Sequence, residues 1–149
     1  MYNIKEIRDE FPILAKRIYG KPLCYLDNGA SAQKPRVVLE AINRVYSSEY
    51  ANVHRGLHFL SNTVTDRFEL VREKIQKFLG AKSSTEIAFT SGTTEALNLV
   101  SYGWGNNNLN KGDEIVLSVM EHHANIVPWH FLREKKGIIL KWVEPRSDG

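Results

Sequence analysis

The sequence has almost no cysteine and no long stretch of one chemical character, and these absences exclude several classes of protein. Its single cysteine, Cys24, rules out an internal disulfide framework and is typical of a reducing compartment. No apolar stretch is long enough to cross a membrane, and the first residues are polar and charged, unlike those of a signal peptide. No run of five or more lysines and arginines occurs. We therefore expect a cytoplasmic protein that binds neither nucleic acid nor a membrane.

The composition is that of an ordinary globular protein. The chain contains 149 residues, of which 42% are hydrophobic and 25% charged. This length suits one domain with a single hydrophobic core, and both fractions lie in the usual range. The net charge of +3 is scattered along the chain. Composition by itself therefore indicates no particular partner.

The first part of the sequence predicts a short helix, an apolar run and a second, longer helix. We expect a helix within residues 3–10, because a proline soon afterwards disfavours its continuation. Residues 22–26 are apolar and predict a strand that ends at the turn-prone residues 27–29. Cys24 lies in this run, so we expect it to be a buried structural thiol. A helix over 35–50 begins at a proline, which suits a first helical turn.

A longer helix is predicted over residues 62–79. Its large apolar residues recur at spacings of three and four, which aligns them on one face. Ser61 is the expected N-cap and Gly80 the expected end. The apolar face consists of Val64, Phe68, Val71, Ile75, Phe78 and Leu79.

The second half of the sequence alternates between strand and helix patterns. Strands are predicted at 86–89, 114–118 and 138–143, and helices at 93–102 and 126–136. Such alternation is typical of an α/β fold with a parallel sheet. Three parallel strands are few for a doubly wound sheet, so we expect the sheet to be incomplete within this chain.

A glycine turn joins a predicted strand to a predicted helix in residues 89–95, Phe-Thr-Ser-Gly-Thr-Thr-Glu. A helix start presents unpaired N–H groups and the positive end of the helix dipole, and both suit a phosphate. Gly92 permits close approach, and the hydroxyls of Thr93 and Thr94 can add hydrogen bonds. The alternative is an ordinary helix cap by Ser91 or Thr93. The segment is neither a Walker loop nor a GxGxxG motif.

A second polar motif, Glu-His-His-Ala-Asn over residues 121–125, follows a predicted strand. Ligands of open α/β sheets bind at this end of the strands, where a histidine could stack on a cofactor or transfer a proton. Adjacent histidines on an extended chain point in opposite directions, and no cysteine cluster or HExxH motif accompanies them. We therefore expect no metal site, and two surface histidines remain the alternative.

A third polar segment, Asn-Val-His-Arg-Gly-Leu-His over residues 52–58, precedes the long helix. Its two histidines and one arginine suit the binding of an anionic substrate. A solvated loop with no such role is the alternative, and the segment in isolation favours it.

Taken together, in this order and at these spacings, the motifs resemble the cysteine desulfurases of the class V aminotransferase group. Residues 25–35, Tyr-Leu-Asp-Asn-Gly-Ala-Ser-Ala-Gln-Lys-Pro, resemble the opening of these enzymes, although Asn-Gly replaces the small residues often found there. Residues 52–58, 90–98 and 121–129 match the same family. The His-Arg-Gly-x-His loop and the His-His-Ala-Asn-Ile-Val-Pro-Trp string point to its SufS-like branch.

The resemblance covers essentially the whole chain and implies its fold class. That fold is the N-terminal part of the PLP-dependent transferase fold type I, an α/β fold with a parallel-rich sheet and flanking helices, and here incomplete. Residues 1–20 would form an N-terminal segment, and residues 21–149 the first part of the PLP-binding large domain. Full-length members would form homodimers.

The resemblance also implies pyridoxal 5'-phosphate (PLP) as the cofactor and assigns residues to it. The backbone at Thr93 and Thr94, with the Thr94 hydroxyl, would hold the phosphate. His123 would stack on the pyridine ring and assist proton transfers, as the catalytic residue of this part of the chain.

Ala30, His54 and Arg55 would serve the substrate, L-cysteine. Ala30 would leave room beside it, and His54 and Arg55 would lie near the active site across the dimer interface. The family reaction converts L-cysteine to L-alanine and leaves a persulfide on the enzyme. A SufE- or SufU-like partner would accept that sulfur for iron–sulfur cluster assembly.

Family members are much longer than this chain, and the resemblance implies that further catalytic residues lie beyond Gly149. These are the Schiff-base lysine, the aspartate that pairs with the pyridine nitrogen and the persulfide-forming cysteine, so we expect the chain to be inactive alone. A selenocysteine lyase-like or other class V PLP enzyme is the alternative within the family. A non-catalytic phosphate-binding module is the alternative outside it.

Overall fold

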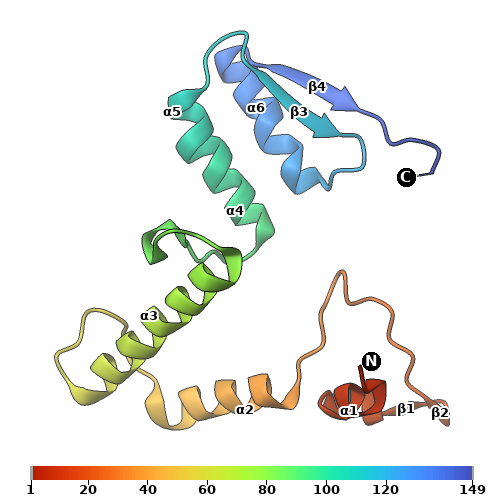
Figure 1. Ribbon diagram of the computed structural model, residues 1–149, viewed down its shortest axis with the longest axis vertical. Helices are drawn as coiled ribbons and strands as arrows, with labels where there is room; N and C mark the ends of the chain where they lie inside the picture. The colour runs from red at the N-terminus through yellow and green to blue at the C-terminus, as the bar shows by residue number, and fades with distance from the viewer. Residues whose placement is uncertain (1, 149) are drawn as a thin grey trace. The chain divides into compact units, whose positions relative to one another are not determined.

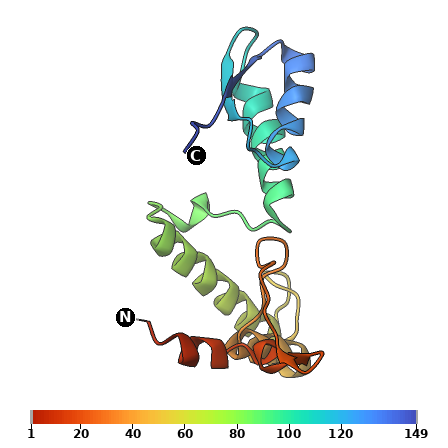
Figure 2. The ribbon, with the colours of Figure 1, turned by 90° about the vertical axis from the view of Figure 1, so that its right-hand side faces the viewer.

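The computed structural model describes residues 2–148, which divide into two compact units. The first unit extends to Ile87 and the second begins at Ala88. Figure 1 shows the ribbon coloured along the chain, and Figure 2 shows it turned by 90°. None of the described helices is long and apolar enough to cross a membrane.

The first unit opens with a short helix and a two-residue hairpin. Helix α1 spans Ile4–Asp9 and is followed by a 3-10 turn at Pro12–Ala15. Strands β1, Arg17–Ile18, and β2, Lys21–Pro22, pair antiparallel across a turn whose two residues both have positive φ. Turns of this kind match the right-handed twist of the strands that they join. Helix α1 confirms the short helix predicted within residues 3–10.

The strand predicted over residues 22–26 is wrong beyond its first residue. The Tyr25 hydroxyl donates hydrogen bonds to the backbone oxygens of Asp27 and Ser31, at 3.2 and 2.7 Å. These bonds hold the segment after Tyr25 in a turn and not in an extended strand. Cys24 is exposed, so the prediction of a buried thiol is also wrong.

Two further helices complete the first unit. Helix α2 spans Arg36–Arg44 and continues through a π-helical turn at Val45–Glu49, which confirms the helix predicted over 35–50. Helix α3 spans Phe59–Leu79 and ends at Gly80, whose φ of 71° is the left-handed conformation that glycine adopts readily. The long helix and its end are therefore as predicted.

The start of α3 differs from the prediction. His58 is its N-cap, because the His58 Nδ1 accepts a hydrogen bond from the Ser61 backbone N–H at 3.4 Å. Ser61 lies buried within the helix. Its hydroxyl donates to the backbone oxygen of Asn52 at 2.6 Å and accepts from the Gly56 N–H at 3.0 Å. The serine thus ties the preceding loop to the helix instead of capping it.

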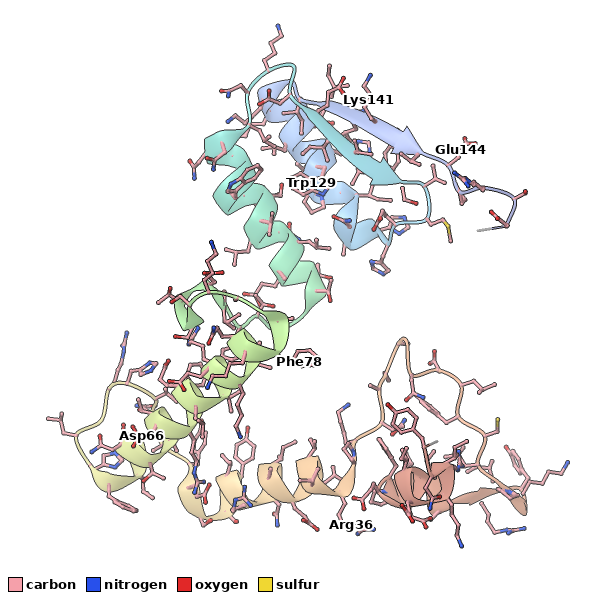
Figure 3. The ribbon with its side chains drawn as sticks, viewed as in Figure 1. Arg36, Asp66, Phe78, Trp129, Lys141 and Glu144 are labelled. Atoms are coloured by element: carbon pink, nitrogen blue, oxygen red, sulfur yellow. The ribbon has the colours of Figure 1, made fainter. Side chains whose placement is uncertain are left out.

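Much of the apolar face of α3 is not covered within this unit. Phe78, labelled in Figure 3, is 86% exposed, and Val71 and Leu79 are exposed as well. Periodicity therefore predicted the helix correctly, while the burial of its apolar face depends on contacts that the unit does not supply.

The strand predicted at 86–89 is wrong. Ser84–Glu86 form a 3-10 turn, which is closed by a capping box between Ser83 and Glu86. The Arg72 guanidinium donates to the carbonyl of Ile87. The cap and the Arg72 side chain therefore engage backbone groups of Glu86 and Ile87, and no described strand pairs with the segment.

The second unit is a layer of helices on a two-stranded parallel sheet. Helix α4, Thr93–Leu99, runs through a π-helical segment at Val100–Gly105 into α5, Asn106–Asn108, and so extends beyond the predicted end near residue 102. Strands β3, Glu114–Ser118, and β4, Ile139–Val143, pair in parallel from Glu114↔Ile139 to Ser118↔Val143. Helix α6, Val127–Lys136, connects them and packs against β4 and the π-helical segment. These elements confirm the α/β pattern predicted for this half.

The core of the second unit lies between α6, the helical run and the sheet. Trp129 is labelled within it in Figure 3. The buried Ser101 hydroxyl also donates to the Pro128 backbone oxygen at 3.2 Å, which links the helical run to α6. The buried apolar side chains of this core are Leu109, Leu117, Trp129, Leu132 and Ile138.

Gly105, in the helical run, lies against this core. A β-carbon there would lie 2.9 Å from Leu132 Cδ2 and 3.5 Å from both Leu109 Cδ1 and Trp129 Cζ3. We expect Gly105→Ala to lower the free energy of unfolding of the second unit by about 1–3 kcal/mol, because overpacking forces the neighbours to shift. Native-state hydrogen exchange of the β3 and β4 amides measures this change.

Gly103 supplies a matched control in the same π-helical segment. Its β-carbon would meet only Leu99 Cδ1, at 3.9 Å. We expect Gly103→Ala to be neutral or slightly stabilising, because alanine has the higher helix propensity. Equal effects of the two substitutions would show that the close approach at Gly105 does not matter.

Candidate functional site

The start of α4 carries the first half of the site. Gly92 is its N-cap and, with no side chain, provides no capping bond. The N–H groups of Thr93 and Thr94 lie in the first turn, where no helix carbonyl is available, and no other described residue accepts from them. Neither Ser91 nor Thr93 caps the helix, so the ordinary-cap alternative is not what forms here.

Ser91 instead binds a carboxylate of the same turn. Its backbone N–H and its hydroxyl donate to Glu95 Oε2 at 2.5 and 2.6 Å. These bonds, first from the hydroxyl and then from the backbone, hold the pKa of the Glu95 carboxyl below its ordinary value. Glu95 is thus ionised at neutral pH, and its charge is directed to Ser91.

The loop after β3 carries the second half. Asn125 Nδ2 donates to Glu121 Oε2 at 3.0 Å, and His122 Nδ1 accepts from the Ala124 backbone N–H at 3.1 Å. His123 begins a 3-10 turn, His123–Asn125, that leads into α6. The two adjacent imidazole rings lie at 88° to one another, with 6.2 Å between their centroids.

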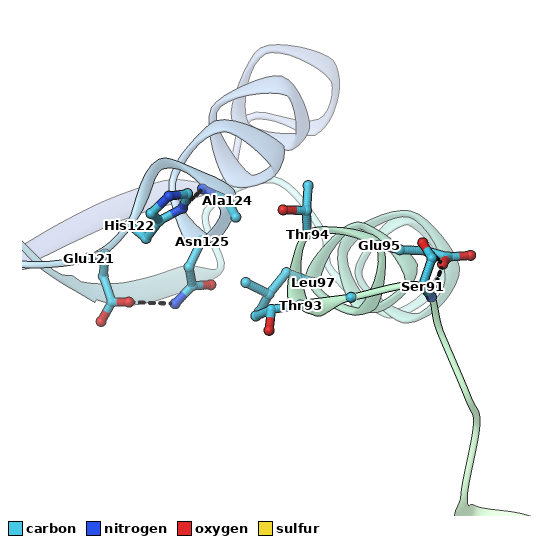
Figure 4. A pocket seen from close by; sticks show the side chains of 10 residues that line it. Ser91, Thr93, Thr94, Glu95, Leu97, Glu121, His122, Ala124 and Asn125 are labelled. Carbon is cyan, nitrogen blue, oxygen red and sulfur yellow. Dashed lines mark hydrogen bonds between the residues drawn. The ribbon is translucent and has the colours of Figure 1, made fainter. Parts of the chain in front are cut away.

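A pocket of about 700 Å³ lies between these two segments, within the second unit. Figure 4 shows the side chains of Thr93 and Thr94 on one wall and those of Glu121, His122 and Asn125 on the other. The volume is in the range of small-molecule sites. The lining residues are Ser91, Gly92, Thr93, Thr94, Glu95, Leu97, Glu121, His122, Ala124 and Asn125.

The structure brings some of the predicted cofactor residues together. Thr93 and Thr94 both line the pocket, whereas His123 is exposed beside it and its neighbour His122 contributes to the wall. Sequence reasoning did not single out Asn125, although it lies four residues after Glu121 and four before Trp129. That spacing was the available signal, since side chains four apart in helical turns meet.

The predicted substrate residues lie in the first unit. Ala30 is exposed in the turn that follows Tyr25, where its N–H donates to the Asp27 backbone oxygen at 3.2 Å. Arg55 is exposed and forms no hydrogen bond or ion pair with any described residue. A free guanidinium of this kind can bind a carboxylate.

His54 is held firmly to α3. Its Nε2 lies 2.8 Å from Glu69 Oε1, its backbone N–H donates to the Thr65 hydroxyl at 2.9 Å, and its ring meets Phe68 edge-on at 5.7 Å between centroids. These contacts support a positive φ of 66°, which few residues other than glycine adopt. His54 and Arg55 therefore sit on a loop of defined shape.

The pocket residues fit the phosphate and the ring of PLP. The phosphate requires several hydrogen-bond donors, and the unpaired N–H groups and two hydroxyls at the start of α4 supply them. The two carboxylates on the walls are already engaged, Glu95 by Ser91 and Glu121 by Asn125. An imidazole of the opposite loop can face an aromatic ring.

Comparison with known proteins agrees with this fit. Residues 24–149 match the aminotransferase class-V family. The chain is 54% identical over 138 residues to a probable cysteine desulfurase of Synechocystis sp., an alignment that covers 93% of this chain and 33% of the relative.

Two solved structures are similar throughout the chain. An apo cysteine desulfurase of Thermococcus onnurineus is 37% identical with a TM-score of 0.86, over 100% of this chain and 35% of that one. The cysteine desulfurase CsdA of Escherichia coli is 36% identical with a TM-score of 0.79, over 99% of this chain and 36% of that one. The chain thus spans about one third of the length of the proteins it matches.

The α/β fold described above corresponds to one part of the fold of these larger enzymes. Class V aminotransferases and cysteine desulfurases use PLP, the cofactor that the pocket residues fit. From its sequence match, its fold and its site, the chain belongs to the aminotransferase class-V family of PLP-dependent enzymes.

Proposed function

We propose that this chain forms the phosphate-binding part of a PLP-dependent cysteine desulfurase. The observation that carries the proposal is the pocket in which the start of α4, with Thr93 and Thr94, faces the histidine-bearing loop after β3. The relatives named cysteine desulfurase support the choice of reaction. The reaction consumes L-cysteine and a protein thiol and yields L-alanine and a persulfide.

Within this proposal, Thr93 and Thr94 hold the phosphate through their backbone N–H groups and the Thr94 hydroxyl. PLP, when bound, supplies an electron sink for cleavage of the carbon–sulfur bond. His123 packs on the ring and holds or moves a proton beside it. Two hydrogen bonds from Ser91 to Glu95 Oε2 hold the Glu95 carboxylate in one place at this helix start.

The substrate residues complete the proposal. Ala30 leaves space beside L-cysteine, and Arg55, which has no partner among the described residues, offers a guanidinium to its carboxylate. His54, fixed by Glu69 and Thr65, keeps Arg55 at a defined place on the loop. His54 and Arg55 reach the site across a homodimer interface.

We further propose the setting of this reaction. The chain belongs to the SufS-like branch and to a cytoplasmic enzyme, is inactive alone, and is part of a protein that passes sulfur to a SufE- or SufU-like acceptor for iron–sulfur cluster assembly. Residues 1–20 form an N-terminal segment, and residues 21–149 the first part of the PLP-binding large domain.

A selenocysteine lyase-like activity is the second candidate, because sulfur and selenium substrates share these motifs. Alanine release from L-cysteine compared with L-selenocysteine separates the two.

The Thr94 hydroxyl provides the direct test of the phosphate site. We expect Thr94→Val in the intact protein, meaning the full-length enzyme, to weaken PLP binding by about 1–2 kcal/mol. This is the value of one hydrogen bond to a charged group. Absorbance titration with PLP measures the affinity. Thr94→Ser, which keeps the hydroxyl, should bind nearly as well as the wild type. Unchanged affinity in Thr94→Val would remove Thr94 from the site.

A further inference from the structure

The loop that bears both histidines is closed by a chain of two side-chain hydrogen bonds. Trp129 Nε1 donates to Asn125 Oδ1 at 3.0 Å, and Asn125 Nδ2 donates to Glu121 Oε2 at 3.0 Å. Figure 4 shows the second bond on the pocket wall. Glu121 and Asn125 flank His122 and His123 in sequence, so their bond closes the loop around these two residues.

The chemistry of the three groups fixes the direction of both bonds. An indole N–H can only donate, so the Asn125 amide must turn its oxygen toward Trp129. Its NH₂ group then faces Glu121, and an ionised carboxylate can only accept. The order donor, amide, carboxylate therefore permits a single amide orientation, and each member holds the next in place.

Trp129 anchors this chain of bonds. It is 7% exposed and packs in the core with Leu117 and Leu132. The other hydrogen bonds described for the loop join residues at most three apart in sequence, and they include those from the Ala124 N–H to His122 Nδ1 and from the Asn125 N–H to the His122 backbone oxygen. They shape the turn, whereas the Trp129–Asn125 bond ties it to the core.

We propose that Asn125 is a positioning residue that fixes the His122–His123 loop against the pocket by linking Glu121 to the buried Trp129. This inference rests on the proposed function, in which the His122–His123 loop faces the ring of PLP. Asn125 itself acts through the two histidines and not by contact with a reacting atom. A loosened loop places the His122–His123 pair less often where an imidazole can face the ring, so PLP affinity falls.

A swap of the two polar groups tests the proposal, because the swapped pair keeps the net charge of the wild type while the single variant does not. Asn125→Asp removes the donor and sets a second carboxylate against Glu121. We expect it to raise amide exchange over residues 122–126 and to weaken PLP binding by about tenfold, the scale of one lost hydrogen bond to a charged group. Hydrogen exchange by mass spectrometry and PLP titration of the intact protein measure these effects.

The double variant Glu121→Gln/Asn125→Asp restores the pair in reverse. The new glutamine amide donates to the new aspartate, which still accepts from Trp129, so protection and PLP affinity should both return close to wild type. Glu121→Gln alone, which keeps an acceptor oxygen, should have a small effect. If the link were only structural, amide protection would fall in Asn125→Asp and recover in the double variant, while PLP affinity would be the same in all variants.

The two readouts separate the possible failures. A double variant no better than Asn125→Asp overturns the hydrogen-bonded link. If the double variant restores slow amide exchange but PLP affinity is the same in every variant, the link exists and the positioning role is overturned. A wild type that binds no PLP contradicts the proposed function instead, while the exchange arm still decides whether the link orders the loop.

Discussion

Replacing His123 by alanine should lower the rate of alanine production from L-cysteine by about 10²- to 10⁴-fold, the range of a lost proton-transfer group. His123 is exposed on a loop and contributes no core contact, so stability should change by less than about 0.5 kcal/mol. The measurements are turnover of the intact protein with saturating PLP and its thermal unfolding. A large loss of rate with an unchanged melt assigns the effect to chemistry.

The adjacent histidine is the natural comparison. His122 lines the pocket, and its Nδ1 accepts the Ala124 N–H, so His122→Ala removes a turn contact. We expect it to loosen the loop and to cost less activity than His123→Ala. The reverse order of effects would reassign the ring-facing role to His122, and near-normal turnover in both variants would exclude the loop from catalysis.

Replacing Leu132 by alanine should have the largest effect on stability. Leu132 is 1% exposed and fills the core of the second unit beside Trp129 and Leu117. We expect a loss of about 2–5 kcal/mol in the free energy of unfolding of this unit, because the deleted side chain leaves a cavity. Hydrogen exchange of the β3 and β4 amides measures it locally, which avoids the assumption of two-state unfolding for the whole chain.

Leu99→Ala is the matched control for this core substitution. Leu99 ends α4 in the same unit but is 54% exposed. Its truncation should change the unfolding free energy by less than about 1 kcal/mol, because little apolar surface returns to water. Similar losses in the two variants would mean that Leu99 is covered in the protein as it exists.

The order of the pocket loop depends on the same core as the stability of the second unit. Trp129 contributes its ring to the packing around Leu132 and its N–H to Asn125 on the pocket wall. Loss of the Leu132 side chain should therefore also raise exchange in the loop 121–125. Trp129 thus links the stability of the second unit to the order of the pocket loop.

Local patterns predicted most helices and both parallel strands. The three-and-four spacing of apolar residues identified α3, and Gly80 ends it in a left-handed conformation, as local sterics favour. The alternation in the second half identified β3, α6 and β4. These features depend on residues close together in sequence, so sequence alone was sufficient.

Predictions failed where a side chain competed for the backbone. Residues 22–26 and 86–89 have strand-like composition, but the Tyr25 hydroxyl curls the first segment, and the Arg72 guanidinium binds a carbonyl in the second. A strand also requires a neighbouring strand, which composition cannot supply. Ser61 looked like an N-cap, yet it bonds to Asn52 nine residues earlier.

The sequence by itself determined the family resemblance, the α/β alternation and the assignment of Thr93 and Thr94 to a helix start, because each depends on motif order or local periodicity. Only the tertiary structure decided that this helix start faces the loop after β3, that His122 rather than His123 lines the wall, and that Asn125 connects Glu121 to Trp129. Those relations arise because the core around Leu132 packs α6 against the helical run. Packing of residues distant in sequence, and not any local pattern, brings the two walls of the pocket together.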